Sequence, residues 1–143
     1  MNKFVKHTCL FLTIITLYGC SGDPSSYVQN MDGYWEIYQV KKDNDIIKEY
    51  TINGSVDYFK VHEQLTGYRK KVMPNFDGSF TISDHETPFK LSIDDQQLHI
   101  KYKVDTDSIE ETILSVSEDE MRIKNQDGFI YIYKPFEKLS IIE

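Results

Sequence analysis

The sequence predicts an all-β domain, an antiparallel up-and-down meander that closes into a small barrel of eight or nine strands. Three observations support this prediction. Apolar and polar residues alternate along most of the chain, which is the pattern of a strand with one buried face. Turn-forming residues separate the alternating runs at short intervals. The links are too short for parallel crossovers, and closure removes the exposed edges of an open meander. An open sandwich is the second choice.

Residues 1–19 form the first element, a leader that we expect to be removed. Lys3 and Lys6 give it a basic start, and an apolar stretch over 9–17 follows. This order is typical of a secretory signal peptide. The apolar part is shorter than the roughly 20 residues that span a bilayer, so we expect no permanent transmembrane anchor.

Leu17-Tyr18-Gly19-Cys20 follows and resembles the bacterial lipobox. The resemblance implies that the Cys20 thiol receives a diacylglycerol, that the leader is cut before it, and that the new amine takes an acyl chain such as palmitate. Turn-forming residues come next, so residues 20–30 are predicted to be the acylated cysteine and a flexible tether. Such chains hold a protein to a membrane through their buried methylenes. We expect a lipid-anchored protein of the bacterial cell envelope, at the outer membrane.

Residues 31–143 are predicted to be the barrel domain. Turn signals such as Asn53-Gly54 and Asp127-Gly128 separate its strands. The last strand is apolar on both faces, and we expect the segment 27–31 to cover its outer face; the alternative is an aromatic face left partly exposed. The strands are expected at 34–41, 55–62, 65–73, 79–83, 88–93, 97–104, 109–116, 120–125 and 128–134.

Gly33-Tyr34-Trp35 opens the first predicted strand. This tripeptide resembles the Gly-x-Trp signature of lipocalins. The order of lipobox, tether, short hairpins and tyrosine-rich last strand is similar to that of short lipid-anchored bacterial lipocalin-like proteins. In lipocalins the tryptophan packs at the closed end of the barrel beneath a basic side chain. The resemblance therefore implies a barrel floor formed by Gly33, Trp35 and Lys134, with the lysine over the indole face. A plain core tryptophan is the alternative.

An eight-stranded barrel is just wide enough to be filled by side chains or to hold one small ligand. Tyrosine hydroxyls above an apolar pocket are a usual composition for such a site. For each candidate lining residue, simple core filling is the alternative. The candidates are Tyr58, Phe89, Leu91, Ile100, Tyr102 and Tyr131, and the predicted inward-facing residues also include Phe80, Ile82, Leu98, Met121 and Ile123.

Motifs for chemistry are sparse in this sequence. It contains no nucleophile elbow, phosphate loop, dinucleotide fingerprint or paired-histidine zinc motif. His62 and His85 have acidic neighbours and would form a metal or acid–base cluster only if their strands met. A net charge of −7 opposes binding to nucleic acid. We expect no catalytic residue, no metal and no cofactor.

The sequence thus favours a lipid-anchored lipoprotein whose barrel binds a small hydrophobic ligand. The expected partners are the membrane, through lipid on Cys20, and a small apolar molecule. The alternative is a structural or interaction lipoprotein with a filled core and no ligand. An enzyme such as a hydrolase or isomerase ranks last, because a fold does not supply a reaction.

Overall fold

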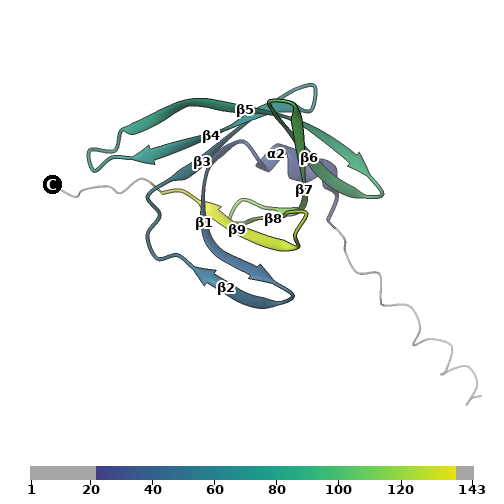
Figure 1. Ribbon diagram of the computed structural model, residues 1–143, viewed down its shortest axis with the longest axis horizontal. Helices are drawn as coiled ribbons and strands as arrows, with labels where there is room; N and C mark the ends of the chain where they lie inside the picture. Colours follow the sequence, from purple (N-terminus) through teal and green to yellow (C-terminus); the bar gives the residue numbers. More distant parts are fainter. Residues whose placement is uncertain (1–21, 138–143) are drawn as a thin grey trace, which may run out of the picture.

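Within residues 22–137, the part of the chain that it describes, the computed structural model of the protein shows an eight-stranded antiparallel barrel, one additional strand and one helix (Figure 1). The helix is α2 (Pro24–Asn30). The strands are β1 (Gly33–Lys42), β2 (Asp45–Glu49), β3 (Val56–His62), β4 (Thr66–Pro74), β5 (Phe80–Asp94), β6 (Gln97–Val104), β7 (Asp107–Val116), β8 (Met121–Lys124) and β9 (Phe129–Pro135).

The pairing of β1 with β9 closes the barrel. The sheet order is β2-β1-β3-β4-β5-β6-β7-β8-β9, and Trp35 of β1 lies opposite Pro135 of β9. Because β9 occupies one edge of β1, β2 and β3 share the other edge, with β3 at 33–35 and β2 at 39–42. The predicted all-β, antiparallel, closed meander is confirmed.

Strand β2 is the one strand that the sequence pattern does not predict. All five of its residues are exposed, so no alternation of apolar and polar residues marks it. It is formed by a hairpin with β1, and the two turn residues Asp43 and Asn44 both have positive φ. Such turns match the twist of a two-stranded ribbon.

Strand β5 also differs from the prediction, because it is one continuous strand rather than two at 79–83 and 88–93. Phe89 and Leu91 are buried, and they fix which residues of β5 face the barrel interior. Phe80 and Ile82 therefore lie on the outer face, and the prediction that they face inward is wrong. Phe80 stacks on Tyr34 there, with ring centroids 4.8 Å apart.

Helix α2 occupies part of the segment predicted as a flexible tether. Asp23 caps it, since its Oδ1 accepts a hydrogen bond from the Ser25 amide at 2.9 Å. Tyr27 and Val28 pack against the hydrophobic core, and such packing stabilises a helix this short. The helix contacts β6 and β7. The segment 27–31 therefore covers the core at one end of the barrel, and the prediction that it covers the outer face of the last strand is wrong.

The interior of the barrel has an apolar end and a polar end. Trp35 and Met31 lie at the apolar end, where the indole Nε1 donates a hydrogen bond to the Met31 carbonyl at 3.0 Å. The polar end is formed by inward positions of β3, β4 and β7 that carry Asp57, Arg69 and Glu111, and it meets the apolar end where Asp57 lies opposite Trp35 in the β1–β3 pairing. The apolar end is filled by buried side chains, which include Phe89, Leu91, Leu98, Ile100, Ile113, Met121 and Ile123.

Candidate functional site

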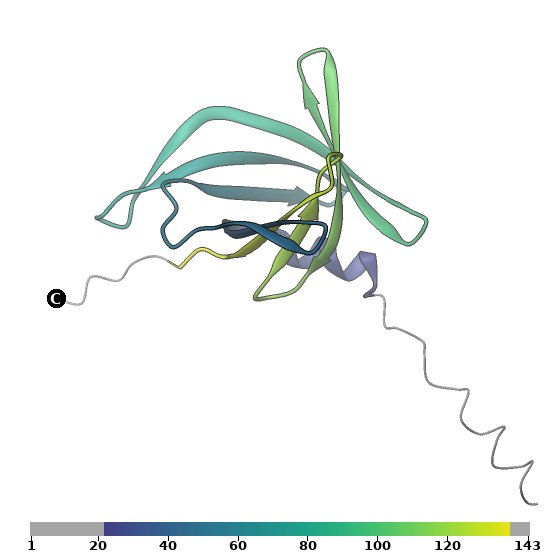
Figure 2. The same ribbon diagram turned by 60° about the horizontal axis from the view of Figure 1, so that its bottom comes forward.

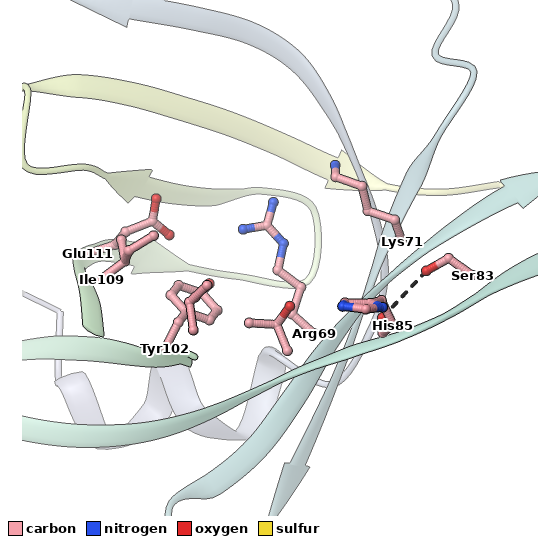
Figure 3. Close-up of a pocket in the computed structure, with 9 residues that line it drawn as sticks. Arg69, Lys71, Ser83, His85, Tyr102, Ile109 and Glu111 are labelled. Carbon is pink, nitrogen blue, oxygen red and sulfur yellow. Dashed lines mark hydrogen bonds between the residues drawn. The ribbon is translucent and has the colours of Figure 1, made fainter. Parts of the chain in front are cut away.

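The polar end of the barrel holds a pocket of about 390 Å³ (Figure 3). Volumes of about 300–1,000 Å³ are typical of small-molecule sites, so the hollow is large enough for one small ligand. Its walls are the inner faces of four neighbouring strands, β4 to β7. The lining residues are Arg69, Lys71, Ser83, His85, Thr87, Tyr102, Val104, Ile109 and Glu111.

The pocket exists because β5 and β6 separate part of the way along. The two strands pair as far as Phe89, which lies opposite Tyr102. Beyond this point the first half of β5 pairs with β4 alone, and the end of β6 pairs with β7 alone. Figure 2 shows the tip of the β6–β7 hairpin standing away from the long arm of β5. The inner faces of these two hairpins line the opening.

A buried ion pair joins β3 to two pocket-lining residues of β4, Arg69 and Lys71. Asp57 is 3% exposed, and its two carboxylate oxygens accept hydrogen bonds from Arg69 Nη2 at 2.7 Å and Lys71 Nζ at 3.2 Å. Arg69 Nη2 also donates to Tyr133 Oη at 3.1 Å. The guanidinium carbon lies 5.3 Å from the ring centroid of Phe59 and 5.9 Å from that of Tyr102. These contacts hold the Arg69 guanidinium in one place.

The environment of these groups determines their protonation. Burial by itself would raise the pKa of Asp57, but Arg69 and Lys71 outweigh it, and the pKa lies below its ordinary value. Asp57 is therefore ionised at neutral pH. Burial raises the pKa of Tyr102 and of Tyr133 well above the ordinary value, so both hydroxyls keep their protons.

Three buried polar atoms of the pocket have no hydrogen-bond partner among the described residues. They are Arg69 Nε, Tyr102 Oη and Glu111 Oε2. An unpartnered buried polar group costs about 1–3 kcal/mol, and native proteins contain few of them. Burial raises the pKa of Glu111, an effect that Arg69 opposes. Figure 3 shows the Arg69 guanidinium and the Glu111 carboxyl group facing one another across the pocket. The three atoms have almost no accessible surface, so a ligand in the pocket would contact other polar atoms of its lining.

A second hollow, of about 550 Å³, lies outside the barrel near β2. It is lined by Tyr38, Glu49, Tyr50, Thr51, Asp119 and Lys134. It is the more open of the two hollows. The pocket at the polar end of the barrel is therefore the better candidate for a binding site.

The candidate ligand-lining residues divide into three groups in the structure. Tyr102 lines the pocket. Phe89, Leu91 and Ile100 are buried in the filled apolar end, and Tyr131 packs against it, so these four serve as core. Tyr58 lies on the outer face, with its ring centroid 4.6 Å from that of Tyr34. Its predicted place in the barrel lining is wrong, because Phe59 takes the inward position.

The implied barrel floor is only partly assembled. Trp35 is buried near α2, and Gly33 has a φ of +140°, a conformation that favours glycine. Lys134 lies opposite Glu36 in the β1–β9 pairing, and its Nζ is 3.1 Å from Glu36 Oε1. Strand alternation turns this ion pair away from Trp35. The implied contact of Lys134 with the indole face is therefore wrong, and the cations that pair with the inward-facing Asp57 are Arg69 and Lys71.

Other predicted features lie elsewhere or outside the described residues. Cys20 and the leader fall outside them. Within residues 22–137, no helix is long and apolar enough to cross a membrane. The same residues contain no group of three or more His, Cys, Asp or Glu side chains that could hold a metal ion. His85 lines the pocket, whereas His62 contacts Tyr68, with ring centroids 6.1 Å apart.

Sequence reasoning misses Asp57, Arg69 and Glu111, although the sequence carries a signal for two of them. Asp57 lies two residues before the buried Phe59, and Glu111 lies two residues before the buried Ile113, so each carboxylate shares a strand face with a buried residue. A charged residue on the apolar face of a strand is expected only where it is paired or functional. The position of these two carboxylates on the apolar faces of their strands could therefore have indicated the site.

Comparison with known proteins agrees with the architecture. The family model of lipocalin-like domains matches residues 31–123 of this chain. The structure of a lipocalin-like protein from Bacteroides uniformis is similar, with 12% identity, a TM-score of 0.46, and coverage of 75% of this chain and 99% of that chain. An uncharacterised protein from Bacteroides eggerthii is similar at 11% identity and a TM-score of 0.46, with 74% and 99% covered. No curated protein matches the chain. Because the family model covers more than half of its length, the protein belongs to the family of lipocalin-like domains.

Proposed function

We propose that the protein binds a small amphipathic molecule in the pocket at the polar end of the barrel. The observation that carries this proposal is a pocket of about 390 Å³ at the polar end of the barrel, lined in part by Arg69, Tyr102 and Glu111. Val104 and Ile109 add apolar surface beside them. A pocket of this kind, with apolar walls and a few convergent polar groups, is the usual form of a small-molecule site. The role is binding rather than catalysis.

Native mass spectrometry of the protein purified from its own source tests this role, because a bound molecule adds a defined mass. Ile109→Trp places a large side chain in the pocket and should abolish the added mass. Leu114→Trp is the matched control, since Leu114 lies on the same strand, is exposed, and does not line the pocket. Equal retention of ligand by both variants would place the ligand elsewhere.

The proposed setting is the bacterial cell envelope, with the barrel held at the outer membrane by lipid on Cys20. The support is the order of basic start, apolar stretch and Leu-x-Gly-Cys in the sequence. Two or more acyl chains hold a protein stably to a membrane. Cys20→Ala should abolish labelling by radioactive palmitate in cells and alter processing of the precursor. Unchanged labelling would refute the anchor.

A second candidate function is an interaction lipoprotein that acts through its surface. It is favoured by the filled apolar end of the barrel and by the outer aromatic cluster of Tyr34, Tyr58, Phe80 and Phe136. Site-specific photocrosslinking from position 34 tests it. This role requires crosslinks to one defined partner, and their absence under conditions that capture known complexes would count against it.

A further inference from the structure

The pocket has two walls of opposite chemistry. The wall on β4 and β5 carries polar side chains, among them Lys71 and His85. The wall on β6 and β7 carries Val104 and Ile109, two apolar side chains that are exposed although they share the inner face of their hairpin with Tyr102. Figure 3 shows His85 and Ile109 on opposite sides of the pocket. A ligand between these walls therefore needs a polar group on one side and apolar surface on the other.

Lys71 and His85 are pocket-lining groups that remain open to solvent. The Lys71 side chain is largely exposed, and its Nζ donates one hydrogen bond to Asp57. An ammonium group has three donors, so two are left for other acceptors. The His85 residue is exposed, and its ring has no partner among the described residues. Both side chains can therefore donate hydrogen bonds to a ligand.

The carboxylates near the pocket are covered. Asp57 is buried, and its two oxygens accept hydrogen bonds from Arg69 and Lys71. Two cations share this one carboxylate, so the three groups together keep one positive charge. Burial raises the pKa of Glu111, which favours its uncharged form, and Glu111 Oε2 has almost no accessible surface. In a chain with a net charge of −7, this opening is a local site that attracts an anion.

Arg69 closes the inner end of the pocket. Its guanidinium lies over the rings of Phe59 and Tyr102, and its Nη2 donates a hydrogen bond to Tyr133. These three aromatic residues are buried, so their rings fill the interior beneath the guanidinium. An extended acyl chain cannot pass them into the apolar end of the barrel. The ligand must therefore be compact.

We propose that the pocket binds a compact amphipathic anion, a carboxylate or a similar acid on a ring-sized apolar body. The acid group accepts hydrogen bonds from Lys71 Nζ and the His85 ring, and the apolar body packs against Val104 and Ile109. This inference rests on the binding role proposed above, and it adds the charge and the size of the ligand.

Isothermal titration calorimetry of the purified protein at neutral pH and low salt tests the inference with cinnamate, cinnamamide and nonanoate. Cinnamate and cinnamamide share one apolar body and differ in the charge of the polar end. Cinnamate should bind about fivefold more tightly or better, because a carboxylate makes the stronger hydrogen bonds to Lys71. Nonanoate has the same number of carbon atoms as cinnamate. It should bind more weakly than cinnamate, because its flexible chain loses more conformational freedom in a short pocket.

Variants of two lysines locate the origin of the charge preference. Lys71→Gln should weaken the binding of cinnamate about fivefold and change that of cinnamamide little. Lys71→Arg keeps the charge and should keep the preference. Lys103→Gln is the matched control, because Lys103 is exposed beside Val104 and does not line the pocket. It should leave both affinities unchanged.

The possible outcomes separate this inference from the binding role. If cinnamamide binds as tightly as cinnamate, or nonanoate binds more tightly than cinnamate, the pocket binds ligands but the inference is overturned. An equal response to Lys71→Gln and Lys103→Gln traces the preference to net charge and overturns it as well. If no probe binds, the inference fails, and native mass spectrometry of Ile109→Trp still decides the binding role. If Lys71→Gln does not fold, the three probes on the unaltered protein decide the question together with His85→Gln, which should weaken cinnamate.

Discussion

The buried carboxylate of Asp57 gives a stability prediction that the structure allows us to quantify. Asp57→Asn keeps the shape of the side chain but removes the charge that Arg69 and Lys71 share. Loss of one partner of a buried ion pair costs about 3–5 kcal/mol. The Arg69 side chain is 21% exposed and keeps its bond to Tyr133, which favours the lower end, about 3 kcal/mol. Lys71 is 60% exposed and adds about 0–1 kcal/mol.

Urea denaturation followed by the fluorescence of Trp35, the single tryptophan, measures this loss. For a domain of about 100 residues, each kcal/mol lowers Tm by roughly 4–8 °C, so a thermal melt should shift by about 12 °C or more. Asp32→Asn is the matched control, because Asp32 pairs with Lys60 at 2.9 Å on the surface, where such pairs contribute about 0–1 kcal/mol. If Asp57→Asn costs no more than Asp32→Asn, the buried pair does not stabilise the barrel and our reasoning is wrong.

The lowered pKa of Asp57 also sets the sign of a pH dependence. A carboxylate whose pKa is lower in the folded state stabilises the fold above the unfolded pKa, and this stabilisation is lost as the pH falls through the folded pKa. The difference in unfolding free energy between the unaltered protein and Asp57→Asn should be largest at neutral pH. It should shrink below about pH 4, the ordinary range for Asp. A constant difference would contradict the ionised state assigned to Asp57.

Two further predictions test the packing of the barrel. Gly67→Ala should lower the free energy of unfolding by about 1–3 kcal/mol or more in urea denaturation, because the added Cβ would overlap the Lys60 carbonyl oxygen and lie 2.6 Å from the Phe89 ring. Nothing lies within 4 Å of a Cβ at the control position Gly54, so equal costs at the two positions would contradict this account. Lys134→Met should leave the fluorescence emission of Trp35 unchanged, because Lys134 turns away from the indole; a shifted maximum would restore the contact that the lipocalin resemblance implies.

The sequence predicts the strands best where each strand has one buried face and one solvent-exposed face. Leu98, Ile100 and Tyr102 alternate with polar residues in β6, and all three are buried. The pattern fails in two situations. In β2 no face is buried, so nothing alternates. In the first half of β5, Ser83, His85 and Thr87 line the pocket. The inward face is therefore polar, and the alternation no longer shows which residues face inward.

The candidate site was the part least accessible to sequence reasoning. Of the six candidate lining residues, the structure places only Tyr102 in the pocket. Large apolar residues commonly line small-molecule sites, but here they fill the other end of the barrel. The polar wall depends on Asp57 of β3 meeting Arg69 of β4, and it gains its third member from Tyr133 at the far end of the chain.

The amino-acid sequence by itself determined the all-β class, the antiparallel connections and most strand positions. Alternation and turn signals depend on residues that are close in the sequence, so they can be interpreted without knowing the tertiary structure. The tertiary structure alone decided the closure of β1 on β9, the separation of β5 from β6, and the charges that meet inside. These features join residues far apart in the chain, and their energies depend on burial, which only the closed barrel creates.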